Sequence, residues 1–370
     1  MRTIFAISAI TLCLSIIELI SHEELESTGA YLIERIQSSR SEESDDFFLM
    51  IGAVTSICFF LVSGICYLVG YKDFGLLGIF GSQLGAAFSG ILKVAFAHPR
   101  PFWKYFNIDA LLCSKDFGAP SGHAMSAGAS LFVLGYLWMK SGGWRYLKLV
   151  IIAIIVIITG YDRMYLGVHF YFQIILGYSF ALLIAAIIVY PQTTKLVQRI
   201  GNEKLAFIKS QVLWLVLLVL STIICLFRNS EWDPMWSQNY EKSCGKQFVI
   251  EDVLVKNAAD SYVFSLLAGL TAGHYLQRNN SATEPTVLVV VFAAFLHLGF
   301  INIFLKYLEG FITLSSTDLS GWVFLAIIRY SCGLIYAYFL PLVVSKLFRK
   351  NKSLARENPS FSVLTFKIKI

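Results

Sequence analysis

Apolar segments long enough to cross a membrane recur along this chain of 370 residues, and they set its fold class. A helix needs about 20 mostly apolar residues to cross a hydrocarbon core about 30 Å thick. Inside lipid every backbone polar group needs a partner within the protein, so only helices and closed barrels span a bilayer. Runs of this length are typical of helices. We therefore predict an all-α protein, a polytopic transmembrane helical bundle.

Nine spans are predicted after residue 46. They cover residues 47–69, 74–96, 123–139, 147–161, 170–190, 209–227, 258–276, 287–305 and 321–347. Residues 1–20 are interpreted as a signal peptide or a signal anchor. Residues 21–46 are polar, with one short amphipathic stretch near residues 28–36, and we interpret them as a solvated linker. Residues 47–190 form the predicted core with the motifs described below. Residues 209–348 form an additional transmembrane bundle, and residues 349–370 form a basic cytoplasmic tail.

The composition, with 56% hydrophobic and 15% charged residues, excludes soluble domains and disordered chains. The formal net charge is +6, but the basic residues lie between predicted spans rather than in a stripe, so no nucleic-acid partner is predicted. Basic residues gather in residues 140–148, in residues 191–208 and in the tail, which share one side if nine spans are present. The positive-inside rule makes that side cytoplasmic. We expect an integral protein of the endoplasmic reticulum, plasma or inner membrane, in contact with membrane lipids.

Three polar clusters interrupt the apolar sequence between Lys93 and Gln173. The first runs from Lys93 to Arg100-Pro101, the second is Pro120-Ser121-Gly122-His123, and the third runs from Arg163 through His169 to Gln173. Each cluster lies at the end of a predicted span, so one fold brings all three to the same face of the bilayer. In the predicted topology that face is the lumenal or periplasmic one.

The residue types in these clusters suit a phosphate group. Lys93, Arg100 and Arg163 supply positive charge, and a guanidinium contacts two phosphate oxygens at once. Ser121 and Gly122 precede an apolar run and present backbone N–H groups at a helix start, which favours anions. The clusters therefore predict a phosphate-binding site.

Two histidines, His123 and His169, add the means to hydrolyse a phosphate ester. Histidine changes its protonation near pH 7, so one imidazole can attack phosphorus while the other protonates the leaving oxygen. Any one of these side chains could be an ordinary helix-end anchor, but their joint occurrence in three ordered clusters favours a catalytic site.

The patterns Lys-x6-Arg-Pro, Pro-Ser-Gly-His and Arg-x5-His, in this order, resemble the signature of the type-2 phosphatidate phosphatase superfamily, which includes glucose-6-phosphatases and vanadium haloperoxidases. The resemblance covers residues 93–173. It implies that His169 is a nucleophile forming a phosphohistidine and that His123 is the general acid. It also implies a phosphate cradle made of Lys93, Arg100, Ser121, Gly122 and Arg163. No cofactor or metal is expected.

Two positions depart from the commonest family pattern. Asp162 stands where most members have serine, and Gln173 stands where most have aspartate. His169 and Gln173 are four residues apart, so on a helix the amide oxygen can still accept from the imidazole ring. We therefore assign Gln173 to the catalytic residues, with an orienting role. Asp162 is a carboxylate near the motifs, and we regard it as the next candidate should Gln173 not contact His169.

The resemblance implies an integral-membrane, metal-independent phosphomonoesterase, and we favour a lipid phosphate such as phosphatidate as its substrate. A soluble sugar phosphate is the alternative, because Gln173 and the nine spans are similar to glucose-6-phosphatases. A catalytically silent lipid-binding or transport protein is a third possibility, and the intact motif residues argue against it. A haloperoxidase is disfavoured because those relatives are soluble.

The predicted outer loops contain Cys113 and Cys244. That side is an oxidising compartment, so a disulfide between them is possible. Two free thiols are the alternative. Asp116 falls in the same loop as Cys113, and we expect it to be exposed there.

Overall fold

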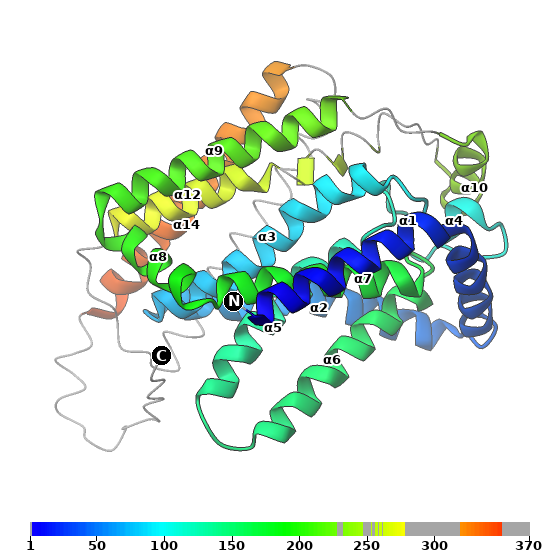
Figure 1. Cartoon of the computed structure of the whole chain (residues 1–370), viewed down its shortest axis with the longest axis horizontal. Helices are drawn as coiled ribbons and strands as arrows, with labels where there is room; N and C mark the ends of the chain where they lie inside the picture. Colours follow the sequence, from blue (N-terminus) through cyan, green and yellow to red (C-terminus); the bar gives the residue numbers. More distant parts are fainter. Residues whose placement is uncertain are drawn as a thin grey trace.

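The computed structural model describes residues 2–227, 232–246, 262–277 and 319–349, together with residues 253, 256, 257, 259 and 260. The described segments are helical, without strands (Figure 1). The helices are α1 (Arg2–Gln37), α2 (Glu42–Leu68), α3 (Lys72–Phe96), α4 (Pro101–Lys104), α5 (Gly122–Lys140), α6 (Arg145–Tyr165), α7 (Tyr171–Ile188), α8 (Pro191–Asn202), α9 (Lys204–Phe227), α10 (Pro234–Cys244), α12 (Val263–Leu276) and α14 (Leu319–Arg349).

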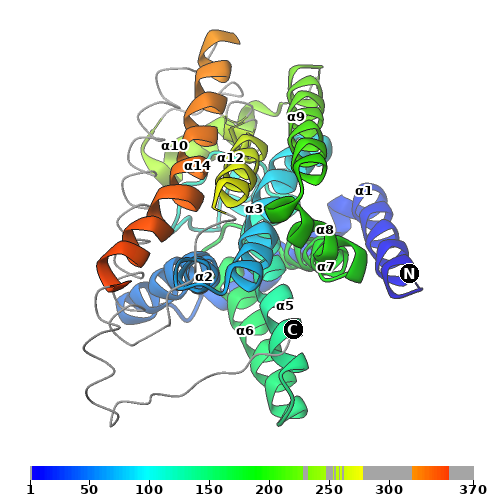
Figure 2. The same ribbon diagram turned by 90° about the vertical axis from the view of Figure 1, so that its left-hand side faces the viewer.

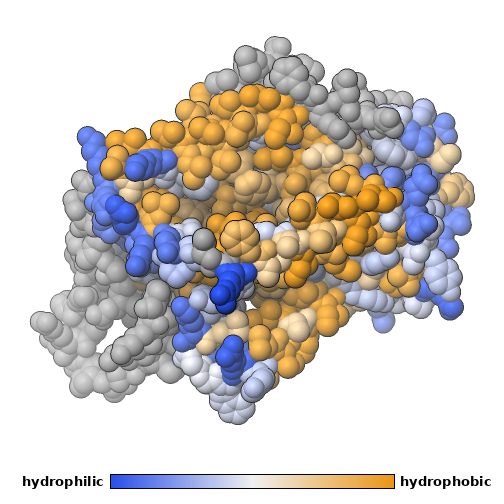
Figure 3. All heavy atoms as spheres, viewed as in Figure 1, coloured by the Kyte–Doolittle hydropathy of each residue, from blue (hydrophilic) through white to orange (hydrophobic). Residues whose placement is uncertain are grey.

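Six of the described helical segments are long and apolar enough to cross a membrane. They are Arg2–Gln37, Glu42–Leu68, Lys72–Lys104, Tyr171–Ile188, Lys204–Ile224 and Phe324–Leu347. Their exposed side chains include many apolar ones, and Figure 3 shows apolar residues across the middle of the molecule with hydrophilic ones gathered toward its edges. The chain is an integral membrane protein, and its all-α fold is confirmed.

The predicted count of nine spans is not confirmed. Eight of the predicted segments coincide with described helices, but α5 and α6 are not among the six candidate spans and α12 has only 14 residues. The segment 287–305 lies outside the described residues.

Small residues let three central helices approach closely. A Cβ atom added to Gly85 of α3 would lie 2.5 Å from the carbonyl oxygen of Met125 on α5. A Cβ atom on Gly128 of α5 would lie 2.9 Å from the ring of Tyr178 on α7. Such glycines are the usual means of close helix packing in membranes. Figure 2 shows α9, α12 and α14 together on the other side of α3, where Phe80 and Phe88 of α3 contact Trp214 and Phe264.

Helix α1 differs from the sequence-based interpretation. It continues through a kink at Ser21 to Gln37, and the side chains of Glu26 and Ile33 are fully buried. Glu26 pairs with Lys104 of α4 at 2.6 Å, which offsets the cost of burying its charge. The prediction of a solvated linker at residues 21–46 is therefore wrong over residues 21–37. The polar residue Glu26 is buried against a partner that is distant in sequence, Lys104, and sequence periodicity does not reveal such a contact.

The three polar clusters meet at one end of the bundle. In Figure 1 the end of α3, helix α4 and helix α10 lie together at the right, whereas α8 lies toward the left. A backbone hydrogen bond joins the second cluster to the third: the N–H of Ser121 donates to the carbonyl oxygen of Gln173 at 3.0 Å. The convergence that the sequence predicted is present. The side of the membrane that this end faces stays a prediction.

Candidate active site

Lys93 and Arg100 are brought together by the way α3 ends. Lys93 lies in the last turn of α3, and Ala97 adopts a left-handed conformation with φ 53° that stops the helix. Proline at position 101 then begins α4, so that Arg100 becomes its extended N-cap residue. Both cationic side chains are buried. A buried cation requires anionic or polar partners, so these two side chains are candidates for binding a ligand.

His169 lies in the short turn between α6 and α7. Gly167 makes this turn with φ +71°, and a Cβ atom there would lie 2.2 Å from the carbonyl oxygen of Asp109. The turn places His169 Nε2 at 3.3 Å from Arg100 Nη1, which also donates to the carbonyl oxygen of Val168 at 2.8 Å. The first and third sequence clusters therefore meet at a histidine–arginine contact.

Gln173 fixes the orientation of the His169 ring. Its Nε2 donates to the carbonyl oxygen of Pro99 at 3.0 Å, so its Oε1 is the atom that faces the ring. His169 Nδ1 lies 3.3 Å from that oxygen, and the backbone N–H of Phe170 donates to it at the same distance. An amide oxygen only accepts, so Nδ1 carries the proton and Nε2 keeps its lone pair. The contact predicted at four-residue spacing is present.

The surroundings of His169 keep its ring neutral. Burial is the largest cause, and the positive charges of Arg100 and Lys93 add to it, so the pKa of His169 lies well below its ordinary value. A neutral imidazole whose Nε2 carries a lone pair is the nucleophilic form, and here Arg100 Nη1 donates to that nitrogen.

His123 lies in the first turn of α5, two residues after the N-cap residue Ser121. The Ser121 hydroxyl accepts from the N–H of Ala124 at 3.4 Å and so caps the helix. His123 Nε2 lies 3.0 Å from the hydroxyl of Thr55 on α2, and its Nδ1 lies 3.5 Å from Arg163 Nη1. Thr55 was missed by sequence reasoning because nothing in its sequence context marks it.

Arg163 reaches the site from the last turn of α6. A Cβ atom added to Gly52 of α2 would lie 2.1 Å from Arg163 Nη2, so the guanidinium packs closely against α2 at this glycine. Asp162 is fully buried, and its Oδ2 accepts from Arg163 Nε at 2.7 Å and also from Nη2. The aspartate that replaces the usual serine is therefore the ion-pair partner of the neighbouring arginine.

Asp116 is a further residue of the site that sequence reasoning placed wrongly. Arg100 donates from Nη2 to Asp116 Oδ1 and from Nε to its carbonyl oxygen, both at 2.6 Å, and Lys93 Nζ donates to Oδ2. Burial raises the pKa of Asp116, but the charges of Arg100 and Lys93 outweigh it and hold that pKa well below its usual range. Asp116 is buried, so the expectation of an exposed loop residue is wrong. The loop sequence carries no periodicity from which this inward position could be read.

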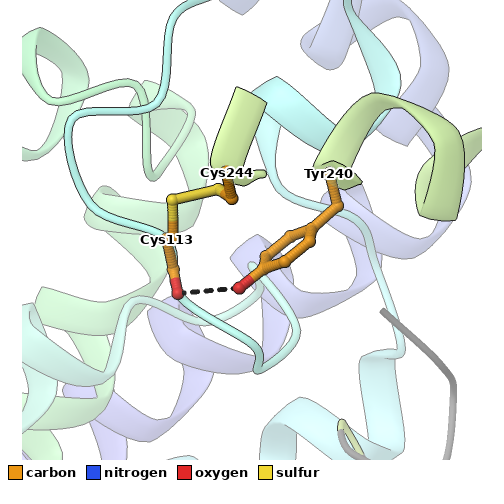
Figure 4. Close-up of a disulfide and its surroundings, with 3 residues drawn as sticks. All are labelled: Cys113, Tyr240 and Cys244. Carbon is orange, nitrogen blue, oxygen red and sulfur yellow. Dashed lines mark hydrogen bonds between the residues drawn. A yellow bond between two sulfur atoms is a disulfide. The ribbon is translucent and has the colours of Figure 1, made fainter. Parts of the chain in front are cut away.

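A disulfide holds the loop that carries Asp116. Cys113 and Cys244 are bonded, with Cα atoms 5.8 Å apart across a sequence separation of 131 residues, so of the two possibilities the disulfide is present. Figure 4 shows the Tyr240 hydroxyl beside it, donating to the carbonyl oxygen of Cys113 at 3.1 Å. Helix α10 is thereby attached to the loop between α4 and α5.

A polar cavity of about 540 Å³ adjoins Pro99, one residue from Arg100. Its lining combines ionisable and aromatic side chains, namely His22, Glu26, His98, Lys104, Trp232 and Trp236. His98 Nδ1 pairs with Glu18 Oε1 at 2.5 Å, and the rings of His22 and His98 stack with centroids 4.7 Å apart. The cavity therefore offers polar contacts beside the predicted phosphate cradle.

Comparison with known proteins agrees with the motifs. Residues 75–196 match the family model of the PAP2 superfamily. Phosphatidylglycerophosphatase B of Bacillus subtilis (strain 168) is 30% identical over 113 residues, which are 30% of this chain and 52% of that protein. The chain thus spans about half the length of this curated relative.

A solved structure is also similar. The crystal structure of a transmembrane PAP2-type phosphatidylglycerolphosphate phosphatase from Bacillus subtilis aligns with a TM-score of 0.43 and 22% sequence identity, covering 51% of this chain and 94% of that chain. The family match contains the Lys93, Arg100, His123, Arg163 and His169 positions within its bounds. Residues 75–196, which contain all three polar clusters, are thus similar to the PAP2 superfamily.

Proposed function

We propose that this protein is an integral-membrane phosphomonoester phosphatase that acts through a phosphohistidine at His169. The observation that carries the proposal is the setting of the His169 ring. Gln173 holds Nδ1, Nε2 keeps its lone pair, and that lone pair lies beside the Arg100 guanidinium at 3.3 Å. A nucleophile next to a phosphate-binding cation is the arrangement that phosphoryl transfer requires.

In the first step, His169 Nε2 attacks phosphorus, so that a P–N bond forms as the P–O bond to the leaving alcohol breaks. His123 donates its proton to the leaving oxygen. In the second step, His123 takes a proton from water, whose oxygen attacks phosphorus and displaces His169. Lys93, Arg100 and Arg163 stabilise the charge on the phosphoryl oxygens in both steps, with the backbone N–H groups after Ser121. These cations supply the charge neutralisation that a metal provides elsewhere, so we expect metal-independent turnover.

A lipid phosphate is the favoured substrate. The relative in Bacillus subtilis is named for a lipid phosphate, and the site lies at the end of a bundle whose helices expose apolar side chains to the bilayer. The polar cavity beside Pro99 favours the second candidate, a soluble sugar phosphate, because its charged and aromatic lining suits a hydrophilic leaving group. Hydrolysis of phosphatidate compared with hexose phosphates, by detergent-solubilised protein, distinguishes the two.

The covalent step is tested by trapping. Protein incubated with a substrate carrying labelled phosphate and denatured in alkali should retain label, because a P–N bond to histidine survives base and is lost in acid. We expect His169→Ala to retain no label and to lose turnover. His274→Ala is the matched control, since this buried histidine contacts Tyr67 on α2, away from the motifs. Turnover by His169→Ala near the wild-type rate would refute the assignment.

The active site is proposed to face the lumen or periplasm, as the basic linkers predict. A cysteine introduced at the exposed Ser141 should react with an impermeant reagent only from the cytoplasm. One at Asp109, whose side chain is 78% exposed, should react from the opposite side. Both are made in a Cys13→Ser background, because Cys13 is an exposed free thiol. The reversed labelling pattern would place the chemistry in the cytosol.

A further inference from the structure

We propose that Asp116 is an internal anion of the phosphate cradle, which substrate and product phosphate must displace from Lys93 and Arg100. This inference rests on the proposed function. It assigns to Asp116 a role in setting how tightly the site holds a phosphoryl group, and it predicts that removal of its charge strengthens phosphate binding.

The geometry places the carboxylate on the cations that the phosphate needs. Asp116 Oδ1 lies 2.6 Å from Arg100 Nη2, and Oδ2 accepts from Lys93 Nζ. Lys93 Nζ in turn lies 3.6 Å from the position of a Cβ atom on Gly122, at the start of α5. Asp116 therefore bridges the two cations, and one of them, Lys93, lies beside the N-terminus of α5, where backbone N–H groups favour an anion.

Counting charges indicates that Asp116 and phosphate cannot both be fully paired. The described cradle contains the cations Lys93, Arg100 and Arg163, and the carboxylates Asp116 and Asp162. Three positive charges against two negative ones leave one positive charge. A phosphate monoester brings nearly two negative charges near pH 7. Because buried charges are costly unless paired, the incoming dianion competes with the carboxylates for the same cations.

Asp116 is better placed than Asp162 to be displaced. Asp162 is adjacent in sequence to its partner Arg163 and lies within α6, so the pair is held by the helix itself. Asp116 lies in the irregular segment between α4 and α5, 16 residues from Arg100. A change of its side-chain rotamer frees Lys93 Nζ and Arg100 Nη2 without breaking any helix, while Arg100 Nε keeps its hydrogen bond to the Asp116 carbonyl oxygen.

The loop keeps the displaced carboxylate close. On one side Cys113 is bonded to Cys244, and on the other the N–H of Gly118 donates to the carbonyl oxygen of His98 at 2.8 Å. Asp116 is thus attached within three residues in one direction and two in the other. Its return to Lys93 and Arg100 helps to expel inorganic phosphate after hydrolysis, so the competition favours product release.

The test measures inhibition by inorganic phosphate and by orthovanadate in detergent-solubilised full-length protein. Asp116→Asn removes the charge and keeps the size of the side chain, so we expect both anions to inhibit about tenfold more strongly or better. Asp109→Asn is the matched control, because Asp109 lies in the same loop and pairs with Arg40 at 3.0 Å, and we expect wild-type inhibition.

Asp116→Ser serves as a second variant, and the intact Cys113–Cys244 disulfide reports that each variant has folded around the loop. Inhibition of a folded Asp116→Asn protein that equals or falls below wild type would overturn the inference, since the carboxylate would then merely hold the cations in place. A wild-type protein that binds neither anion would instead overturn the proposed function.

Discussion

The two halves of the candidate site each contain an arginine, an aspartate and a histidine, but the two histidines differ in their surroundings. In one half Arg100, Asp116 and His169 lie together, and in the other Arg163 and Asp162 lie beside His123. His169 is 3% exposed, with Gln173 on one ring nitrogen and Arg100 on the other. His123 is partly exposed.

This difference fits the two proposed roles. A nucleophile must present one nitrogen along a fixed line of attack, which a saturated hydrogen-bond environment provides. A general acid must exchange protons with both substrate and water, which requires access. The first half therefore suits the proposed nucleophile, and the second half suits the proposed general acid.

The largest effect that separates the halves is expected from His123→Ala. With an alkyl phosphate, whose alkoxide leaves poorly without a proton, turnover should fall by about 10²–10⁴-fold. With an aryl phosphate, which leaves as a stable anion, the loss should be much smaller. Steady-state rates of the variant and the wild type on the two esters give the loss of turnover on each. Equal losses on both esters would show that His123 is not the proton donor.

A smaller effect is expected from Gln173, which acts through His169. Gln173→Ala should lower kcat by about tenfold or more while KM changes less, because it removes orientation and leaves the cations in place. Gln173→Asp should keep activity but move the acid limb of the pH–rate profile upward. A carboxylate stabilises the imidazolium and raises the pKa of His169, and the protonated ring is not nucleophilic.

Gln173→Asn is the matched neutral control for the aspartate variant, because it has the same length without the charge. Its acid limb should stay at the wild-type position, which lies low because the pKa of His169 is already held below its ordinary value. If the Asp and Asn variants share one profile, the contact between residue 173 and the His169 ring does not influence catalysis.

The sequence predicted some parts of the molecule and not others. The helices, the convergence of the three clusters and the contact of Gln173 with His169 follow from spacing, since apolar runs and four-residue offsets have fixed geometry. Asp116 does not follow, because it reaches Arg100 through an irregular loop whose path depends on the disulfide to α10. The burial of Glu26 is likewise set by a tertiary partner, Lys104.

The smallest and most selective effect is expected at Thr55. Its hydroxyl carries one proton, and the carbonyl oxygen of Ile51 accepts it at 2.8 Å, so the same oxygen can accept a hydrogen bond from His123 Nε2 at 3.0 Å. This contact would make Thr55 the residue that positions the acid, as Gln173 positions the nucleophile.

Thr55→Val removes the hydroxyl at nearly constant shape, and the net value of one hydrogen bond predicts a loss of about two- to tenfold. A structural defect would lower the rates on alkyl and aryl phosphates alike. A positioning role lowers the alkyl rate selectively, in the same sense as His123→Ala, and Thr55→Ser should restore it because the hydroxyl returns. The double variant with His123→Ala should then show no further loss, since Thr55 acts on catalysis only through that ring. Additive losses in the double variant would instead assign Thr55 to the packing of α2. The half of the site that contains His123 would then lack a positioning residue on this helix.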